Sequence, residues 1–237
     1  DITTGVITDL WGIGTDNQRI PSDEEIAAAE SLVNYKDILL RPEDHSVKLA
    51  KAGMSIDLGG IAKGYAVDEV RAIFAKHHIE NGLINLGASS MYALVSNAKG
   101  GPWRIGIKHP RNDDKDTYLG IVAVSNENIS TSGDYERFFE ENGVRYHHIF
   151  DPKTGRPARS GVMSDSVLVD SSIEHGGMLG DMLTTILFVL GPERGMEFAH
   201  SVNGVEAMIT TTDGKIYMTD GFKSHFSDLN SDFKLMP

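Results

Sequence analysis

A long run of short β-type segments, punctuated by Gly, Pro and Asn, separates the helical segments of this chain and constrains its fold most. Apolar side chains at helical spacing predict a first helix that carries Ile26, Ala29, Leu32 and Val33, and further helices at residues 63–77, 178–190 and 193–200. Between and beside them, β-type patterns predict strands at residues 82–86, 91–96, 103–108, 118–125, 129–132, 144–150 and 165–170. Helices and strands do not alternate as βαβα, so this order predicts an α+β fold with a mostly antiparallel sheet and packed helices.

Local signals mark the ends of two elements. Ser22 and Glu25 have the spacing of a capping box, which predicts that the first helix begins just after Pro21. Residues 207–211 and 215–219 flank an Asp-Gly pair, which predicts a tight hairpin because glycine supplies the positive φ that such turns require.

The size and charge of the chain exclude several classes of protein. Its 237 residues contain no repeat and no Pro-rich or Ser-rich linker, which predicts a single domain over residues 1–237 with loop-like stretches at 97–102 and 109–116. The net charge of -12 at pH 7 repels polyanions, so nucleic acid is not an expected partner. The apolar run at residues 186–190 is far shorter than the ~20 residues that cross a bilayer.

The sequence contains no cysteine, so it offers no disulfide, no thiolate nucleophile and no thiolate metal site. It starts with Asp1 and a strand-like run rather than with Met or a signal peptide. We therefore expect that a further N-terminal segment precedes this chain.

Residues 57–64, DLGGIAKG, predict a strand end that turns through two glycines into a helix with Lys63 in its first turn. Backbone amides at such a helix start can face an anion, and the lysine adds a positive charge. The segment has neither the Walker A pattern nor the G-x-G-x-x-G order of dinucleotide folds. The bare pattern favours a tight turn with an ordinary surface lysine, and an anion site is the alternative.

Asp181 and Thr185 are four residues apart and share one face of the helix predicted at 178–190. One carboxylate and one hydroxyl can hold Mg²⁺, because this ion takes its other ligands from carbonyls, waters and substrate phosphate. In isolation the pattern favours the simpler interpretation, an acidic residue that complements the helix dipole.

A histidine pair, His147 and His148, precedes the segment DPKTG at residues 151–155. Successive strand residues face opposite ways, so at most one of these histidines points into a given cavity. The DPKTG segment is typical of a turn in which Asp151 accepts hydrogen bonds from backbone amides. The remaining histidines show no metal-ligand spacing and are expected at the surface: His45, His77, His78, His109, His175, His200 and His225.

Small hydroxyl residues and glycines interrupt the β-type pattern at residues 130–137 and 85–90. Both segments could bring backbone close to a ligand, and both could be ordinary strand ends or bulges. Neither H-E-x-x-H nor a complete nucleophile elbow occurs in the sequence.

Taken together and in order, these segments resemble the ApbE family, the FAD:protein FMN transferases. The matching segments are residues 1–5 with 9–12, 56–64, 85–87, 131–137, 148–157 and 181–191. The resemblance implies an α+β fold that holds a flavin nucleotide in a cleft. It also implies Mg²⁺-dependent transfer of the FMN half of FAD to a threonine or serine hydroxyl of an acceptor protein, with release of AMP.

The resemblance also implies roles for individual residues. The metal would be held by the Asp181 and Thr185 side chains and the Gly60 carbonyl. FAD would be contacted by Asp57, Lys63, Ser132, Glu136, His148 and the backbone near Phe150. Asp181 and His148 are the expected catalytic residues, with His148 as the candidate base for the acceptor hydroxyl because imidazole titrates near neutrality. A role of His148 in orienting the adenine or phosphate is the alternative.

Two other functions fit the same residues. Water could replace the acceptor hydroxyl, which would make the protein a Mg²⁺-dependent FAD pyrophosphatase that yields FMN and AMP. A non-catalytic flavin-binding protein would bind FAD and leave it intact. Because family members are commonly exported, the resemblance implies an extracytoplasmic lipoprotein, anchored through a cysteine in the expected N-terminal segment, that flavinylates a redox protein.

Overall fold

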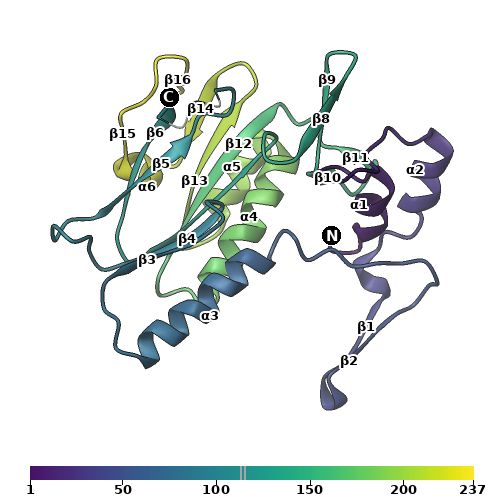
Figure 1. The fold of residues 1–237 in the computed structure, drawn as a ribbon, viewed down its shortest axis with the longest axis horizontal. Coiled ribbons are helices and arrows are strands. Elements are labelled where there is room, and N and C mark those ends of the chain that lie inside the picture. The colour runs from purple at the N-terminus through teal and green to yellow at the C-terminus, as the bar shows by residue number, and fades with distance from the viewer. Residues whose placement is uncertain (113, 115) are drawn as a thin grey trace. The chain divides into compact units, whose positions relative to one another are not determined.

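The computed structural model describes residues 1–112, 114 and 116–237 (Figure 1). The chain divides into two compact units, which we describe separately. The small unit comprises Asp1–Leu58 and Glu136–Ala158, and the sheet unit comprises Gly59–Tyr135 and Arg159–Pro237. That residues 1–237 form one domain stays a prediction.

The sheet unit is built on a seven-stranded sheet with the order β16-β14-β13-β12-β7-β4-β3. Its strands are β3 (Gly82–Leu86), β4 (Ser90–Leu94), β7 (Glu127–Gly133), β12 (Val162–Asp170), β13 (Val205–Thr211), β14 (Lys215–Met218) and β16 (Lys234–Leu235). All neighbouring pairs are antiparallel except β14–β16. The α+β fold with a mostly antiparallel sheet is therefore confirmed.

Helices and a second sheet cover the two faces of this sheet. The helices of the unit are α3 (Ala62–Lys76), α4 (Gly176–Leu190), α5 (Pro192–Ser201) and α6 (Asp220–His225). α4 packs against β12 and β7, and α3 packs against α4, β3 and β4 (Figure 1). The second sheet has the order β15-β6-β5 and consists of β5 (Trp103–Lys108), β6 (Tyr118–Val124) and β15 (Phe226–Ser227). Its side chains join those of the large sheet in one core, in which Leu119 and Val122 belong to the same cluster as Leu168 and Met208.

β12 lies in the middle of this arrangement, and only its last residue, Asp170, is exposed. A strand covered on both faces reads as a nearly continuous buried run rather than as an alternation. In β12 that run includes polar residues, among them Asp165, which has an exposed fraction of 0%. Neither carboxyl oxygen of Asp165 has a hydrogen-bond partner among the described residues.

α3 and α4 touch through their backbones near their N-terminal ends. A Cβ atom on Gly64 would lie 2.1 Å from the carbonyl oxygen of Gly177, and one on Gly177 would lie 2.6 Å from the carbonyl oxygen of Gly64. Real Cβ atoms do not approach backbone so closely, so only glycine at both positions permits this crossing. No helix among the described residues is long and apolar enough to span a membrane.

The small unit contains two helices and three short hairpins. Its elements are α1 (Gly5–Trp11), α2 (Asp23–Glu30), the 3₁₀ turns η1 (Tyr35–Asp37) and η2 (Pro42–Asp44), and strands β1 (Ile38–Arg41), β2 (Ser46–Leu49), β8 (Phe138–Glu141), β9 (Val144–His147), β10 (Phe150–Asp151) and β11 (Arg156–Pro157). Trp11 is the centre of its core, because its ring stacks on Tyr146 at 5.7 Å and its Nε1 donates a 2.8 Å hydrogen bond to the Gly155 carbonyl.

Several predicted elements are confirmed. The helices predicted at residues 63–77, 178–190 and 193–200 correspond to α3, α4 and α5. The capping box of Ser22 and Glu25 is present at the start of α2, although this helix ends at Glu30. The predicted hairpin forms between β13 and β14, with Gly214 at a φ of +79°.

Other predictions are wrong or incomplete. The strand-like run at the N-terminus is wrong, because residues 5–11 form α1. Ile7 and Trp11, four residues apart, are both buried, so helical burial outweighs the β propensity of the β-branched residues there. The strand predicted at residues 144–150 is divided into β9 and β10, and the hairpin of β1 and β2 was not predicted.

The α3–α4 crossing generates a stability prediction. Gly64→Ala should lower the free energy of unfolding by about 1–3 kcal/mol, because the added methyl group meets backbone that cannot yield locally. Urea unfolding measures the effect. Gly101→Ala is the matched control, because a Cβ atom there would have only the Asn97 Nδ2 within 4 Å, at 3.9 Å. Equal stability of the Gly64→Ala variant and the unsubstituted chain would contradict the steric argument.

The buried Asp165 generates a pH prediction. Burial raises the pKa of its carboxyl well above the usual range, so the folded chain keeps this proton at pH values where the unfolded chain has lost it. The corresponding stability is present at low pH and is lost as the pH rises through the folded-state pKa. Asp165→Asn cannot ionise, so its unfolding free energy relative to the unsubstituted chain should increase from about pH 5 to about pH 8.

Asp170→Asn, on the same strand, is the control for this measurement. Hydrogen bonds from Ser172 lower the pKa of Asp170, so this substitution should give no gain as the pH rises. Parallel stability curves for the Asp165→Asn variant and the unsubstituted chain would show that Asp165 ionises normally.

Candidate functional site

Asp181 lies in the second turn of α4 and caps the N-terminus of α3. Its carboxylate is buried, with an exposed fraction of 6%, and its Oδ2 accepts a 3.0 Å hydrogen bond from the amide of Gly64. The residue that precedes α3, Ile61, has no side chain that could cap this helix. The amide groups at a helix N-terminus lack partners within the helix and favour a carboxylate, so α3 fixes the position of the Asp181 side chain.

Thr185 and Gly60 lie beside each other near this carboxylate. Thr185 is one turn beyond Asp181 on the same face of α4, as its spacing predicted. A Cβ atom on Gly60 would lie 3.2 Å from the Thr185 Oγ1, so the absence of a side chain at Gly60 brings its backbone against this hydroxyl. The three residues predicted to hold a metal therefore lie close together in the sheet unit.

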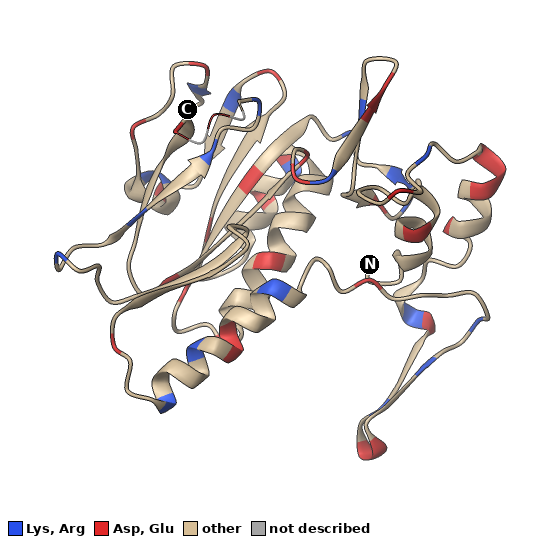
Figure 2. Cartoon of the chain, viewed as in Figure 1, with Lys and Arg blue, Asp and Glu red and all other residues tan. Residues whose placement is uncertain are grey.

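Lys63 and Ser132 belong to the same unit. Lys63 is exposed in the first turn of α3, where Figure 2 shows a basic band. Ser132, on β7, donates a 2.8 Å hydrogen bond to the Thr184 Oγ1. The Thr184 hydroxyl in turn donates a 2.8 Å hydrogen bond to the carbonyl oxygen of Asp181. This chain of hydroxyl groups fixes the second turn of α4 against the sheet.

The donor set fits a hard divalent cation. Among the described residues no group of three or more His, Cys, Asp or Glu side chains could hold a metal. Asp181, Thr185 and Gly60 instead offer a carboxylate, a hydroxyl and a carbonyl. Mg²⁺ accepts such a sparse oxygen set when a phosphate substrate and water supply the other ligands.

The other predicted residues lie in the small unit. The Oδ2 of Asp57 accepts a 2.8 Å hydrogen bond from the Thr8 hydroxyl of α1. Glu136 is exposed, whereas Phe150 is buried in the core around Trp11. Asp151 forms the predicted turn, since its Oδ1 accepts a 2.9 Å hydrogen bond from the amide of Lys153.

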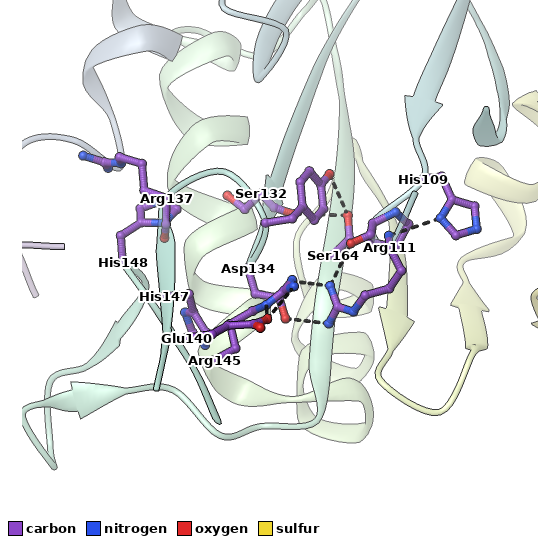
Figure 3. Close-up of polar contacts among 12 residues, drawn as sticks. His109, Arg111, Ser132, Asp134, Arg137, Glu140, Arg145, His147, His148 and Ser164 are labelled. Carbon is purple, nitrogen blue, oxygen red and sulfur yellow. Dashed lines mark hydrogen bonds and ion pairs between the residues drawn. The ribbon is translucent and has the colours of Figure 1, made fainter. Parts of the chain in front are cut away.

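The two neighbouring histidines differ in environment (Figure 3), although β9 ends at His147 and His148 lies outside the strand. His147 is 3% exposed and lies with Nε2 3.0 Å from the Ala158 carbonyl, while its Nδ1 accepts from the amide of Ile149. His148 is partly exposed, and its Nδ1 lies 3.2 Å from the Arg137 carbonyl oxygen. A carbonyl oxygen can only accept, so the neutral ring of His148 carries its proton on Nδ1 and its lone pair on Nε2.

Sequence reasoning missed an ion pair beside Ser132. Arg111 donates two 2.7 Å hydrogen bonds to the buried carboxylate of Asp134, which follows β7 (Figure 3). Arg111 belongs to the stretch 109–116, which predicted only a loop and of which residues 113 and 115 lie outside the described chain. No short-range pattern signals such a pair, because its partners are 23 residues apart.

His109 corrects the expectation that it lies at the surface. It is 5% exposed, its Nδ1 accepts from the amide of Arg111, and its Nε2 lies 3.2 Å from the Asp232 carboxylate. Its ring packs against Phe233 with the centroids 4.9 Å apart. The burial of His109 depends on the C-terminal segment, which is distant in the sequence.

Comparison with known proteins identifies the family of this chain. The ApbE family model matches residues 1–209. An FAD:protein FMN transferase of Klebsiella pneumoniae (strain 342) is 33% identical over 236 residues, which cover 100% of this chain and 71% of the relative. The enzyme of the same name from Treponema pallidum (strain Nichols) is 33% identical over 243 residues, which cover 98% of this chain and 66% of the relative.

A solved structure shares the fold. The ApbE protein of Thermotoga maritima superposes with a TM-score of 0.84 at 36% identity, covering 96% of this chain and 72% of that one. The chain thus spans 71% and 66% of the lengths of the two curated relatives. The order of the motifs, the fold and the family match over most of the chain agree, and they show that this chain belongs to the ApbE family.

Proposed function

We propose that this chain transfers the FMN half of FAD to a threonine or serine hydroxyl of an acceptor protein, releases AMP and requires Mg²⁺. The observation that carries the proposal is the buried Asp181 carboxylate, held at the start of α3 with Thr185 and Gly60 beside it. The names of the relatives support the same reaction.

The residues of the sheet unit suit a pyrophosphate substrate. Asp181, Thr185 and the Gly60 carbonyl would hold Mg²⁺, which when bound neutralises negative charge on the phosphates. Lys63 adds a positive charge in the first turn of α3, and the hydroxyl of Ser132 is a further candidate contact for FAD. Phosphoryl transfer depends mainly on such positioning and charge neutralisation.

The transfer step requires removal of one proton. The acceptor hydroxyl oxygen forms a bond to the phosphorus of the FMN half, and the bond from that phosphorus to the bridging oxygen breaks. AMP leaves with the bridging oxygen, and the hydroxyl proton passes to a base. We assign this base to His148, because its Nδ1–H faces the Arg137 carbonyl and its Nε2 can accept a proton.

The acceptor is proposed to be an extracytoplasmic redox protein, and the chain is proposed to act outside the cytoplasm as part of a lipid-anchored protein. Both points rest on the family resemblance alone. Within the small unit, Asp57, Glu136, His148 and the backbone near Phe150 are the candidate contacts for FAD. Fractionation of cells that express the full-length protein would test the location.

Mass spectrometry of an acceptor domain after incubation with the protein, FAD and Mg²⁺ tests the proposal. The acceptor should gain the mass of FMN less one water. Asp181→Asn should slow this gain by about 100-fold or more, because it removes the only negative charge of the proposed metal site. Glu193→Gln, an exposed carboxylate on α5, is the control and should leave the rate unchanged.

The products separate this reaction from its alternatives. FMN and AMP in solution without an acceptor adduct would make the protein an FAD pyrophosphatase. FAD that binds and stays intact with Mg²⁺ present would make it a flavin-binding protein. Either outcome overturns the proposed transfer.

The assignment of His148 has its own test. His148→Gln should lower the transfer rate by about 100-fold, the usual contribution of a general base. The unsubstituted chain should lose activity as the pH falls, because a protonated ring accepts no proton, and the variant should lack this dependence. His200→Gln, an exposed histidine on α5, is the control. A pH profile that survives in the His148→Gln variant would assign the base elsewhere.

A further inference from the structure

Asp68, on α3, caps the N-terminus of α4. Its Oδ1 accepts a 2.9 Å hydrogen bond from the amide of Gly177, and its Oδ2 accepts one of the same length from the amide of Met178. α4 has no cap of its own, because His175, the residue that precedes it, makes no side-chain hydrogen bond to the helix. Both oxygens of one carboxylate thus satisfy amides that no residue of the helix satisfies.

This contact is the counterpart of the bond between Asp181 and Gly64. Each helix contains the pattern Gly-x-x-x-Asp, at residues 64–68 in α3 and 177–181 in α4. The Asp of each helix accepts from the amide of the Gly in the other, and the two glycines are the positions at which the backbones touch. The two carboxylates therefore form a reciprocal pair of caps around the crossing.

We propose that Asp68 is a positioning residue, which acts through α4 to hold Asp181 and Thr185 against the start of α3. Its two hydrogen bonds fix the first turn of α4, and the Asp181 carboxylate lies one turn further along the same rigid helix. Because the helix backbones touch at Gly64 and Gly177, a small shift of α4 displaces Asp181 from the amide of Gly64. The consequence for Mg²⁺ rests on the proposed function, whereas the coupling between the two caps does not.

Hydrogen exchange of single amides in the unliganded protein, followed by NMR, tests the coupling. Asp68→Ala should accelerate exchange at Gly177 and Met178, which lose their acceptor, and also at Gly64, which Asp68 does not touch. The acceleration at Gly64 should be about fivefold, the effect of losing one cap. In the Asp68→Asn variant these exchange rates should lie between those of the unsubstituted chain and those of the Asp68→Ala variant, because the one side-chain oxygen of Asn can still accept from one of the two amides.

Two controls separate positioning from a general loss of stability. Glu69→Ala removes the neighbouring exposed carboxylate of α3 and should leave Gly64 unchanged. Amides of the β12–β13 ladder report global unfolding, and the change at Gly64 is measured relative to them. If the Asp68→Ala variant does not fold, exchange at Gly64 in the Asp68→Asn variant tests the coupling instead.

A second experiment tests the effect of Asp68 on the proposed metal site by measuring the Mg²⁺ concentration that gives half-maximal FAD turnover. Asp68→Ala should raise this concentration about tenfold, as loss of a residue that orients a metal ligand does, and saturating Mg²⁺ should restore the rate. A lower rate that saturating Mg²⁺ does not restore, or an unchanged Mg²⁺ requirement, would overturn the proposal that Asp68 positions the metal ligands.

The exchange result is decisive independently of activity. Faster exchange at Gly177 and Met178 with no change at Gly64 would show that Asp68 caps α4 locally, and the proposal would be wrong. If the unsubstituted chain turns over no FAD, the proposed function fails, and exchange at Gly64 still decides whether the two caps are coupled.

Discussion

The contact between the backbones of α3 and α4 is the constraint on which the candidate site depends. Glycine at positions 64 and 177 lets the two helices approach until a methyl group at either position would collide with the other backbone. At this distance the amides of one helix lie within reach of the carboxylates of the other. Each N-terminus thereby obtains a negative partner, and Asp181 obtains a fixed position beside Thr185 and Gly60.

The sheet supplies the rigid support for this crossing. β12 and β7 lie under α4, and the hydroxyls of Ser132 and Thr184 connect β7 to the backbone of α4 at Asp181. The ion pair of Arg111 and Asp134 fixes the chain just after β7. In the small unit the backbone carbonyl of Arg137 orients the ring of His148, because it sets which ring nitrogen carries the proton. Side chains with proposed chemical roles are thus held by hydrogen bonds to the backbone and to neighbouring side chains.

Prediction from sequence succeeded where the signal is local. The period of α3 and α4, the capping box of Ser22 and the Asp-Gly turn before β14 each arise from neighbours within a few residues, and each is confirmed. Prediction failed where residues distant in the sequence determine the conformation or the burial of a segment. α1 is a helix because Ile7 and Trp11 share a buried face, although its β-branched residues favour a strand. His109 is buried because Asp232 and Phe233, over 100 residues away in sequence, cover it.

The sequence by itself determined the fold class, the family and the spacing of Asp181 and Thr185 on one helix face, because periodicity and motif order are local properties of the chain. It also contains both Gly-x-x-x-Asp patterns, at residues 64–68 and 177–181. Only the tertiary structure decided that the two patterns cap each other, since 117 residues separate Gly64 from Asp181 and no local signal relates them. Hydrogen bonds across such a separation depend on the sheet, because both helices pack against it and thereby lie side by side.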